Sequence, residues 1–326
     1  AVAAALWTGT PRPDPCTGGP ARLASAWDDR REAARTGMLA TALPNAAETW
    51  ERTERRLSEH GDAWLSAYAR ACEAGVSGTL PPAELDDRMR CLDERRQAMG
   101  ALVGQLASAD AFTVQHAIEA VGQLPAAADC EDAASSRVAV PPPPPAAIAE
   151  VQRVRERLAD VRAHDLTGRH AAGLALVAEL RPAVAAVGYP PLVAELELRE
   201  GTLHIRAGAA AAAREHLETA YFLAKELSHD RVALEAAMNL VFVTGNMQHD
   251  VEAARAWLDH GAAELPLAGT PGLRASFEGL RGVVAAQAQQ HAEAAEHHAR
   301  AVELQTAAQG PDSPAVARSL ANRATS

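Results

Sequence analysis

The sequence predicts an all-α protein, and three observations support this fold class. Hydrophobic residues make up 48% of the chain but aromatic residues only 4%, and alanine supplies much of the apolar share. Such small side chains favour thin, closely packed helices over thick sheet cores. Apolar residues recur at helical spacing, and no segment shows the alternation of a half-buried strand. The second half also repeats with a period of about 40 residues, which is typical of stacked helix pairs.

Composition and charge exclude several classes of function. The 326 residues carry 31 basic and 42 acidic side chains, a net charge of −11. With so few aromatic residues, the chain lacks both the positive field and the stacking platforms that nucleic acid needs, so we expect no nucleic-acid partner. Lys225 is the only lysine, and it lies in Ala-Lys-Glu-Leu, so the Gly-Lys-Ser/Thr of a nucleotide-binding P-loop is absent.

Residues 1–15 predict the end of a possible membrane helix and a linker. They begin AVAAALW, without an initiating methionine, and continue into a proline-rich stretch. Seven residues are too few to span a bilayer, which needs about 20. They fit the outer end of a spanning helix with Trp7 at the interface, and they equally fit a clipped signal sequence or a frayed terminus.

A run of five prolines at 141–145 divides the rest of the chain. Proline runs form stiff polyproline II spacers, here about 15 Å long. We therefore expect a helical domain at 16–132, a proline-rich linker at 133–147 and a second helical unit at 148–326.

The first of these units contains all four cysteines. Its pattern predicts helices near 19–36, 46–74, 83–108 and 111–123, and Cys72 and Cys91 flank the turn between the second and third. In an antiparallel hairpin these two thiols would come within bridging distance, so we expect Cys72–Cys91, with Cys16–Cys130 closing the unit end to end. Reduced, buried thiols are the alternative. The spacing gives only weak support to a zinc site.

The second unit repeats itself. Gly173, Ala213, Ala253 and Ala294 occupy equivalent positions spaced 40, 40 and 41 residues apart, each downstream of a turn. This period predicts a solenoid of four helix pairs plus the first helix of a fifth, in which each pair buries its apolar face against a neighbour.

The repeats resemble tetratricopeptide repeats in the longer form of kinesin-light-chain-like proteins. The strongest local matches are EAAEHHARAVEL at 293–304 and GPDSPAVARSLAN at 310–322. Where that family has an aromatic residue in each first helix, this chain has His164, His204, Thr244 and Ala285. The resemblance implies that the first helices line a groove that binds a protein or peptide. The implied groove residues are Arg155, Leu158, Arg162, Glu195, Leu198, Thr202, Arg206, Glu235, Met238, Phe242, Asn246, Ser276, Val283 and Gln287.

The first unit resembles the segment between the membrane helix and the repeats of certain bacterial transmembrane Ser/Thr protein kinases. The similarity lies in the order of Trp27, Trp50 and Trp64, then Ala71-Cys72, the stretch RMRCL at 88–92, and a final Cys130. It implies a membrane-anchored protein whose kinase lies upstream and whose part described here is extracytoplasmic, acting as a sensor or interaction region. A cytosolic repeat adaptor with reduced cysteines is the alternative.

The sequence predicts no catalytic residue, metal or cofactor for this chain. The kinase motifs are absent, and paired acids such as Asp28-Asp29 fit solvated helix ends. His291 and His298 share a helix face but stand farther apart than the i, i+4 pair that suits zinc. A histidine-metal hydrolase is therefore only a third hypothesis, after the sensor and the adaptor.

Overall fold

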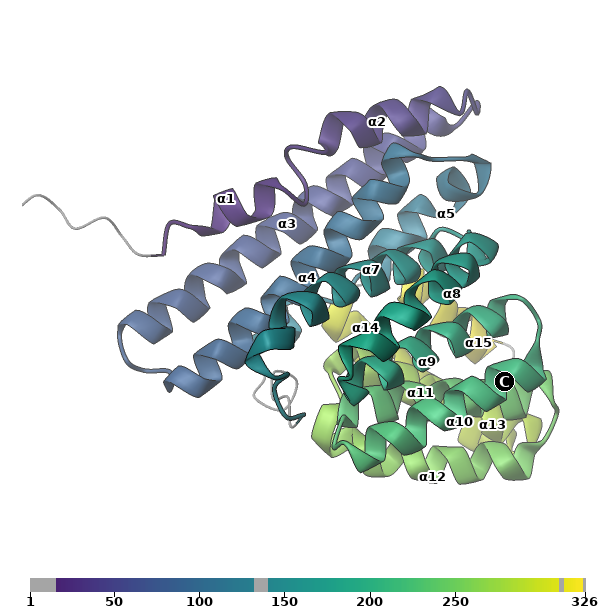
Figure 1. The fold of residues 1–326 in the computed structure, drawn as a ribbon. Coiled ribbons are helices and arrows are strands. Elements are labelled where there is room, and N and C mark those ends of the chain that lie inside the picture. Colours follow the sequence, from purple (N-terminus) through teal and green to yellow (C-terminus); the bar gives the residue numbers. More distant parts are fainter. Residues whose placement is uncertain (1–15, 132–139, 311–313, 325–326) are drawn as a thin grey trace, which may run out of the picture.

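The computed structural model describes residues 16–131, 140–310 and 314–324. Every regular element in these ranges is a helix, which confirms the all-α fold class (Figure 1). The segment 1–7, expected to be the end of a membrane helix, lies outside the described residues. One described helix, α8 (His170–Val187), is by length and composition alone apolar enough to cross a membrane, and in the fold it packs against α7 and α9.

The first unit is built on a long antiparallel hairpin of α3 and α4, on which shorter helices pack (Figure 1). Its elements are α1 (Gly19–Ala24), α2 (Arg31–Ala40), α3 (Ala46–Val76), α4 (Pro82–Ala107), α5 (Ala111–Gly122) and the 3-10 turn η1 (Ala127–Glu131). Asp110 caps α5 by accepting the backbone N–H of Thr113 at 2.9 Å. The expected helices at 46–74, 83–108 and 111–123 agree with these bounds to within two residues.

The single helix expected at 19–36 is wrong, because the chain breaks between α1 and α2. Ala26 and Trp27 in the break are 2% and 4% exposed. Arg30 donates to the carbonyl of Gly100 at 3.3 Å, holding the turn to α4. A straight helix would keep the chain on α3, whereas the break lets α1 pack on α3 and α2 reach α4 as well. The helical spacing of the sequence does not reveal this change of direction.

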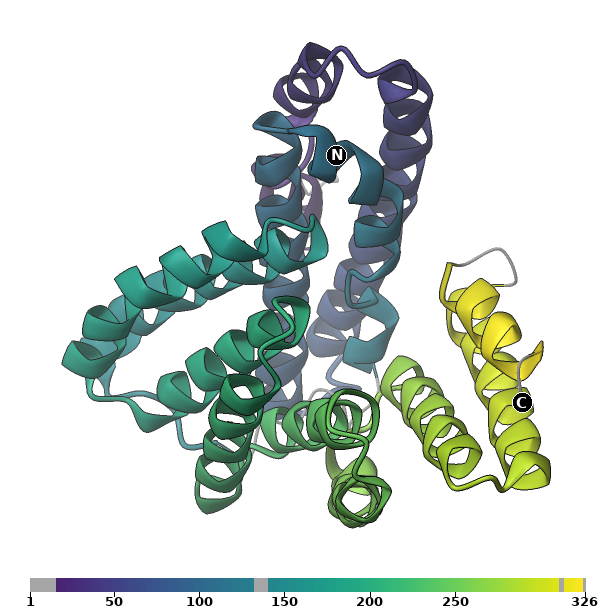
Figure 2. The ribbon, with the colours of Figure 1, turned by 90° about the vertical axis from the view of Figure 1, so that its right-hand side faces the viewer.

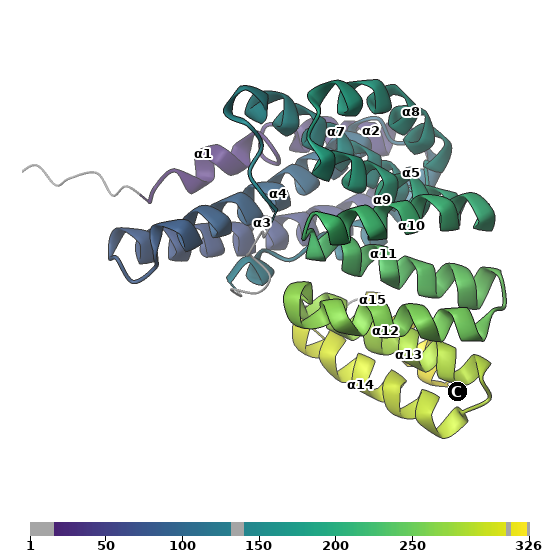
Figure 3. The ribbon, with the colours of Figure 1, turned by 60° about the horizontal axis from the view of Figure 1, so that its bottom comes forward.

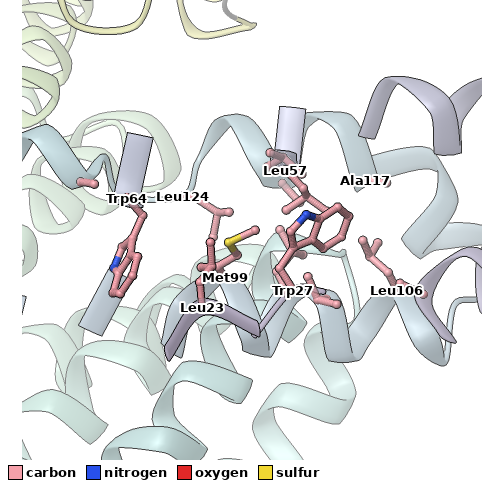
Figure 4. Packing of buried hydrophobic residues seen from close by; sticks show 14 of the residues in the cluster. Leu23, Trp27, Leu57, Trp64, Met99, Leu106, Ala117 and Leu124 are labelled. Atoms are coloured by element: carbon pink, nitrogen blue, oxygen red, sulfur yellow. The ribbon is translucent and has the colours of Figure 1, made fainter. Parts of the chain in front are cut away.

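The core between these helices contains large side chains. Trp27, Leu57 and Met99 meet at its centre (Figure 4), and each is less than 5% exposed. The Trp27 and Trp50 rings lie 6.4 Å apart. Trp64 donates its indole N–H to the carbonyl of Leu92 at 2.7 Å, which ties α3 to α4. Burying such large side chains contributes about 2–3 kcal/mol each.

Both disulfides are present, but their pairing differs from the expectation. Cys16 bonds to Cys72 and Cys91 bonds to Cys130. Cys72 lies one turn before the end of α3, whereas Cys91 lies more than two turns into α4, so the two thiols are offset by about 7 Å along the hairpin. Cys91 instead faces η1, and Cys72 faces the chain just before α1. Each disulfide therefore joins a short peripheral segment to one helix of the hairpin.

The second unit consists of helix hairpins, as the 40-residue period predicts. After the short turn η2 (Pro145–Ala147), the helices are α7 (Ile148–Leu166), α8 (His170–Val187), α9 (Pro190–Arg206), α10 (Ala210–Glu226), α11 (Asp230–Phe242) continued by the π-turn η3 (Val243–Met247), α12 (Val251–Ala268), α13 (Pro271–Gln287), α14 (His291–Gln309) and α15 (Pro314–Ala324). The first helices of successive hairpins, α7, α9, α11, α13 and α15, contact one another in order.

Polar contacts between hairpins recur at the repeat spacing. Arg155 pairs with Glu195 at a separation of 40 residues, and Asp165 pairs with Arg206 at 41. Farther along, similar contacts join Lys225 to Glu264, Tyr221 to His260 and Asn246 to Gln287, with separations of 39, 39 and 41. Equivalent positions in consecutive hairpins therefore touch, which is the geometry expected when each repeat packs on the next.

The two units are in direct contact, so the proline run does not hold them apart. Helix α4 packs on α7, and α5 contacts both α7 and α15. Figures 2 and 3 show the array running from the teal helices to the yellow C-terminal helices beside the first unit. Arg318 of α15 pairs with Glu119 of α5 at 3.4 Å. The start of the proline run lies against the array, where Tyr189 donates its hydroxyl to the carbonyl of Pro141 at 2.7 Å. The hairpins thus curve around one side of the first unit.

Candidate functional site

A cavity lined by both units lies where α4 meets the first helices of the array. Its volume is about 400 Å³, and its walls come from α4, the residues around the proline run, α7, α9, the start of α11 and the end of α12. This volume is within the usual range of small-ligand sites. Both units contribute to the walls, so neither would form the cavity alone.

The expected groove residues are divided between this cavity and other surfaces. Those in the cavity wall are Arg155, Leu158, Arg162, Glu195, Leu198 and Glu235. A smaller adjoining cavity is lined by Arg162, Thr202, Arg206 and Glu235. The others line neither cavity: Phe242, Asn246 and Ser276 are exposed, and Met238, Val283 and Gln287 are half-buried. The α4 side of the first unit thus covers the part of the groove formed by α7 and α9.

Glu195 is the centre of one charged group in the cavity. Arg155 donates to its carboxylate at 2.8 Å from α7, and Nε2 of His229 lies 3.4 Å away at the start of α11. Burial alone would raise the pKa of Glu195, but the hydrogen bonds and positive charges of His229 and Arg155 outweigh it and lower that pKa to about 2. The carboxylate therefore stays ionised and joins three successive first helices.

Glu235 is the centre of a second charged group. Its carboxylate pairs with Arg231 at 3.1 Å and with Arg199 at 3.6 Å. Burial again opposes ionisation, but the charges of Arg231, Arg199 and Arg162 lower the pKa of Glu235 to about 2. In the described chain the guanidinium of Arg162 has no ion pair within 4 Å. Burial, and then the charge of Arg199, lower the pKa of Arg162 to about 10.

Arg95 of α4 faces these groups from the first unit. It is only 2% exposed, and its Nε and Nη2 have no hydrogen-bond partner among the described residues. Its nearest carboxylate oxygen, on Glu94, lies 3.9 Å from Nη1. Burial, followed by the charge of Arg231, lowers the pKa of Arg95 to about 10. A buried guanidinium with unsatisfied donors is costly to the fold, which marks this position as unusual.

Sequence reasoning missed the contribution of α4 and the two arginines that flank Glu235. A signal for Arg95 was present, because it occupies the apolar stripe of its helix together with Cys91, Leu92 and Met99. An arginine at a core position is rare and indicates a partner or a polar cavity beside it. Arg199 and Arg231 carry no such signal, because each resembles an ordinary polar residue of a helix surface.

A second polar cluster lies on α9 and α10. Potential metal-ligand atoms of Glu200, His204 and His216 all lie within 4.8 Å of one another. The guanidinium of Arg181 already pairs with Glu200 and Glu197, and His216 shares its Nδ1 with Glu197 at 2.6 Å. The cluster thus holds a cation of its own, and a metal ion would have to compete with it.

Comparisons with known proteins found no match: no protein-family model, curated protein or solved structure is significantly similar to this chain. The case for its function therefore depends on its own residues.

Proposed function

We propose that this chain is a non-catalytic, peptide- or protein-binding module of tetratricopeptide-like hairpins. The observation that supports it best is the contact of equivalent positions along the first helices and their extensions, at separations of 40 and 41 residues. A continuous layer of first helices offers a peptide a regular series of polar and apolar positions. The part of this layer that a peptide can reach includes Met238, Phe242, Asn246 and Gln287.

Phe242 and Asn246 are the best positioned contacts for such a peptide. The Phe242 side chain is 37% exposed although it is large and apolar, and Asn246 accepts from Gln287 of the next first helix at 3.3 Å. An asparagine amide can bond the peptide backbone through both its donor and its acceptor. An exposed ring beside it supplies the apolar contact that typically anchors a bound peptide.

A peptide array followed by fluorescence polarisation tests this proposal. An array of 15-residue peptides is incubated with the purified protein, and the strongest binder is labelled and titrated. We expect Phe242→Ala to weaken its binding at least tenfold. The matched control is Phe222→Ala, because Phe222 is also an exposed phenylalanine (56%) but lies on the second helix α10. Equal losses in the two variants, or no binder in the array, would contradict the proposal.

We further propose that the module is the extracytoplasmic sensor region of a membrane-anchored bacterial Ser/Thr kinase. Two disulfides, which persist in oxidising compartments, are the observation that supports this location. Alkylation of the natively produced protein followed by mass spectrometry tests it, and we expect no free thiol. Four free thiols, together with protection from protease added outside the inner membrane, would favour the alternative, a cytosolic adaptor.

A further inference from the structure

The cavity between α4 and the array has more arginines than carboxylates in its wall. Six arginines and four carboxylates line it, although the whole chain carries a net charge of −11. Glu195 is shared by Arg155 and His229, and Glu235 by Arg199 and Arg231. These pairs use the cavity's two best-placed carboxylates.

Arg90 pairs with Asp87 outside the wall, and Arg95 and Arg162 are the two remaining guanidiniums. Arg95 is 2% exposed with two nitrogens unpartnered among the described residues, and it lies in the cavity wall opposite α7. Arg162 lies in the same wall without an ion pair in the described chain. The two come from different units, because Arg95 lies on α4 and Arg162 on α7. Two guanidiniums in one cavity wall, one without an ion pair in the described chain and the other with only Glu94 at 3.9 Å, offer charged donors to an anion.

The cavity wall also contains apolar side chains. Ile148 and Leu267 are its accessible ones, at 54% and 50% exposed, whereas Val151, Leu158 and Leu198 are each at most 5% exposed. A bare inorganic anion would leave Ile148 and Leu267 in contact with water. A ligand with a charged head and an apolar body would satisfy both parts of the wall.

We propose that this cavity binds a small amphipathic anion, whose carboxylate or phosphate group is bound by Arg95 and Arg162 and whose apolar body covers Ile148 and Leu267. The site does not depend on a peptide binding the exposed part of the groove. It is built from both units, so a bound ligand would also hold the first unit against the array.

Isothermal titration calorimetry with matched eight-carbon ligands tests the assignment. The probes are octanoate and octyl phosphate, with octan-1-ol and octylammonium as controls for the head group and inorganic phosphate as a control for the chain. We expect at least one of the two anionic amphiphiles to bind, and the tighter of them identifies the head group. All three controls should bind at least tenfold more weakly. Failure of both anionic amphiphiles, or equal binding of octan-1-ol, would overturn the proposal. Equal binding of inorganic phosphate would overturn its apolar part.

The variants Arg95→Met and Arg162→Gln test the two residues directly. Arg95→Met removes a buried charge whose carboxylate contact, with Glu94, is as long as 3.9 Å, and keeps most of the side-chain volume, so the unliganded protein should keep or raise its melting temperature. Its affinity for the anionic amphiphile should nevertheless fall at least tenfold, and Arg162→Gln should behave similarly, because each removes a charged donor. The matched control is Arg157→Gln, on the same helix as Arg162 but exposed and paired with Glu179.

These variants separate this proposal from the one about peptides. Unchanged affinity for the anionic amphiphile in both Arg95→Met and Arg162→Gln would overturn the anion site, whatever peptides bind. Phe242→Ala should leave that affinity unchanged, because Phe242 does not line the cavity. Loss of peptide binding alone in that variant would leave the anion site supported.

Discussion

The two units of this protein reach a stable helical structure by different means. The first packs tryptophan, methionine and leucine side chains into one core and closes it with two disulfides. The central hairpins of the array are packed largely by alanine, with leucine and valine, and are joined by polar contacts that recur every 39–41 residues. A single large core depends on contacts throughout the unit, whereas a repeat depends on its immediate neighbours. A substitution in the first unit should therefore lower the stability of the whole unit, and a substitution in the array should lower the stability of its own and neighbouring hairpins only.

The largest expected effect comes from removing a disulfide. The Cys91–Cys130 bridge closes 39 residues and the Cys16–Cys72 bridge closes 56. In the chain-entropy account, opening a loop of this size costs about 4 kcal/mol. We expect the double variant Cys91→Ala/Cys130→Ala to lower the stability of the first unit by that order, measured by urea unfolding. Hydrogen exchange in α13 and α14 should not change, and faster exchange there would show that the units unfold as one.

The pH dependence of stability should also distinguish the units. Burial, and then the charge of Arg95, lower the pKa of His60 on α3 to about 4. The folded first unit therefore keeps His60 neutral while the unfolded chain binds a proton below pH 6.5. Stability present above pH 6.5 is thus lost as pH falls towards 4, by about 3 kcal/mol at most.

The array should lose stability over a lower pH range than the first unit. Glu195 and Glu235 keep their charge down to a pKa of about 2, so the stability they contribute is present above pH 4.5 and is lost as pH falls towards 2. Hydrogen exchange of peptides from α3 and α9 over a pH series measures both windows. His60→Gln should flatten the change in α3 between pH 6.5 and 4. If hydrogen exchange in α9 also changes between pH 6.5 and 4, the prediction that the two units lose stability over different pH ranges is wrong.

Two glycines allow a smaller comparison of tight packing. A Cβ at Gly37 on α2 would lie 2.3 Å from the backbone oxygen of Ala107, whereas one at Gly201 on α9 would lie 2.6 Å from Cγ of Leu217. A backbone atom cannot move without its helix, but a leucine can change rotamer. We expect Gly37→Ala to cost about 2–3 kcal/mol and Gly201→Ala about 1 kcal/mol, measured by thermal unfolding. The reverse order would mean that the array is the more rigid unit.

The last comparison concerns two ion pairs, and the exposed one gives the smallest expected effect. Lys225 lies 2.8 Å from Glu264, whose side chain is 2% exposed, so Lys225→Met leaves a buried carboxylate without its main partner. We expect a loss of about 1–2 kcal/mol. Arg70→Met removes the exposed pair with Glu131 in the first unit and should cost less than about 0.5 kcal/mol. Chemical denaturation of both variants at low and high salt measures the difference, and a larger loss for Arg70→Met would contradict this ranking.

Local pattern accounts for the elements that could be predicted. The bounds of α3, α4 and α5 follow from helical spacing and from clear turns, such as the Gly-Val-Ser-Gly-Thr-Leu-Pro-Pro stretch before α4. The hairpins follow from the 40-residue period, because equivalent apolar positions recur with it. The break at 25–30 was missed because Trp27 is buried by contacts that depend on α3 and on where α2 must go. The disulfide pairing was missed because it depends on the depth of each thiol along the hairpin.

The candidate site shows the same division. The resemblance to tetratricopeptide repeats placed Arg155, Arg162, Glu195 and Glu235 on first helices. Four helices of the array, α7, α9, α11 and α12, contribute to the cavity that they line. That α4 covers them, and that Arg95 enters the same cavity, depends on how two units separated by a proline run pack together. No local sequence pattern specifies how the two units pack, because their packing depends on the complementarity of the surfaces of the two folded units.

The sequence by itself determined the all-α class, most helix bounds and the repeat, because these arise from short-range periodicity that each segment carries alone. Only the tertiary structure decided which cysteines pair, which part of the groove stays open and which arginines line the cavity. These outcomes depend on distances between residues up to about 200 positions apart, such as Glu119 and Arg318. Such distances are determined by how the helices pack within each unit and how the two units pack against each other.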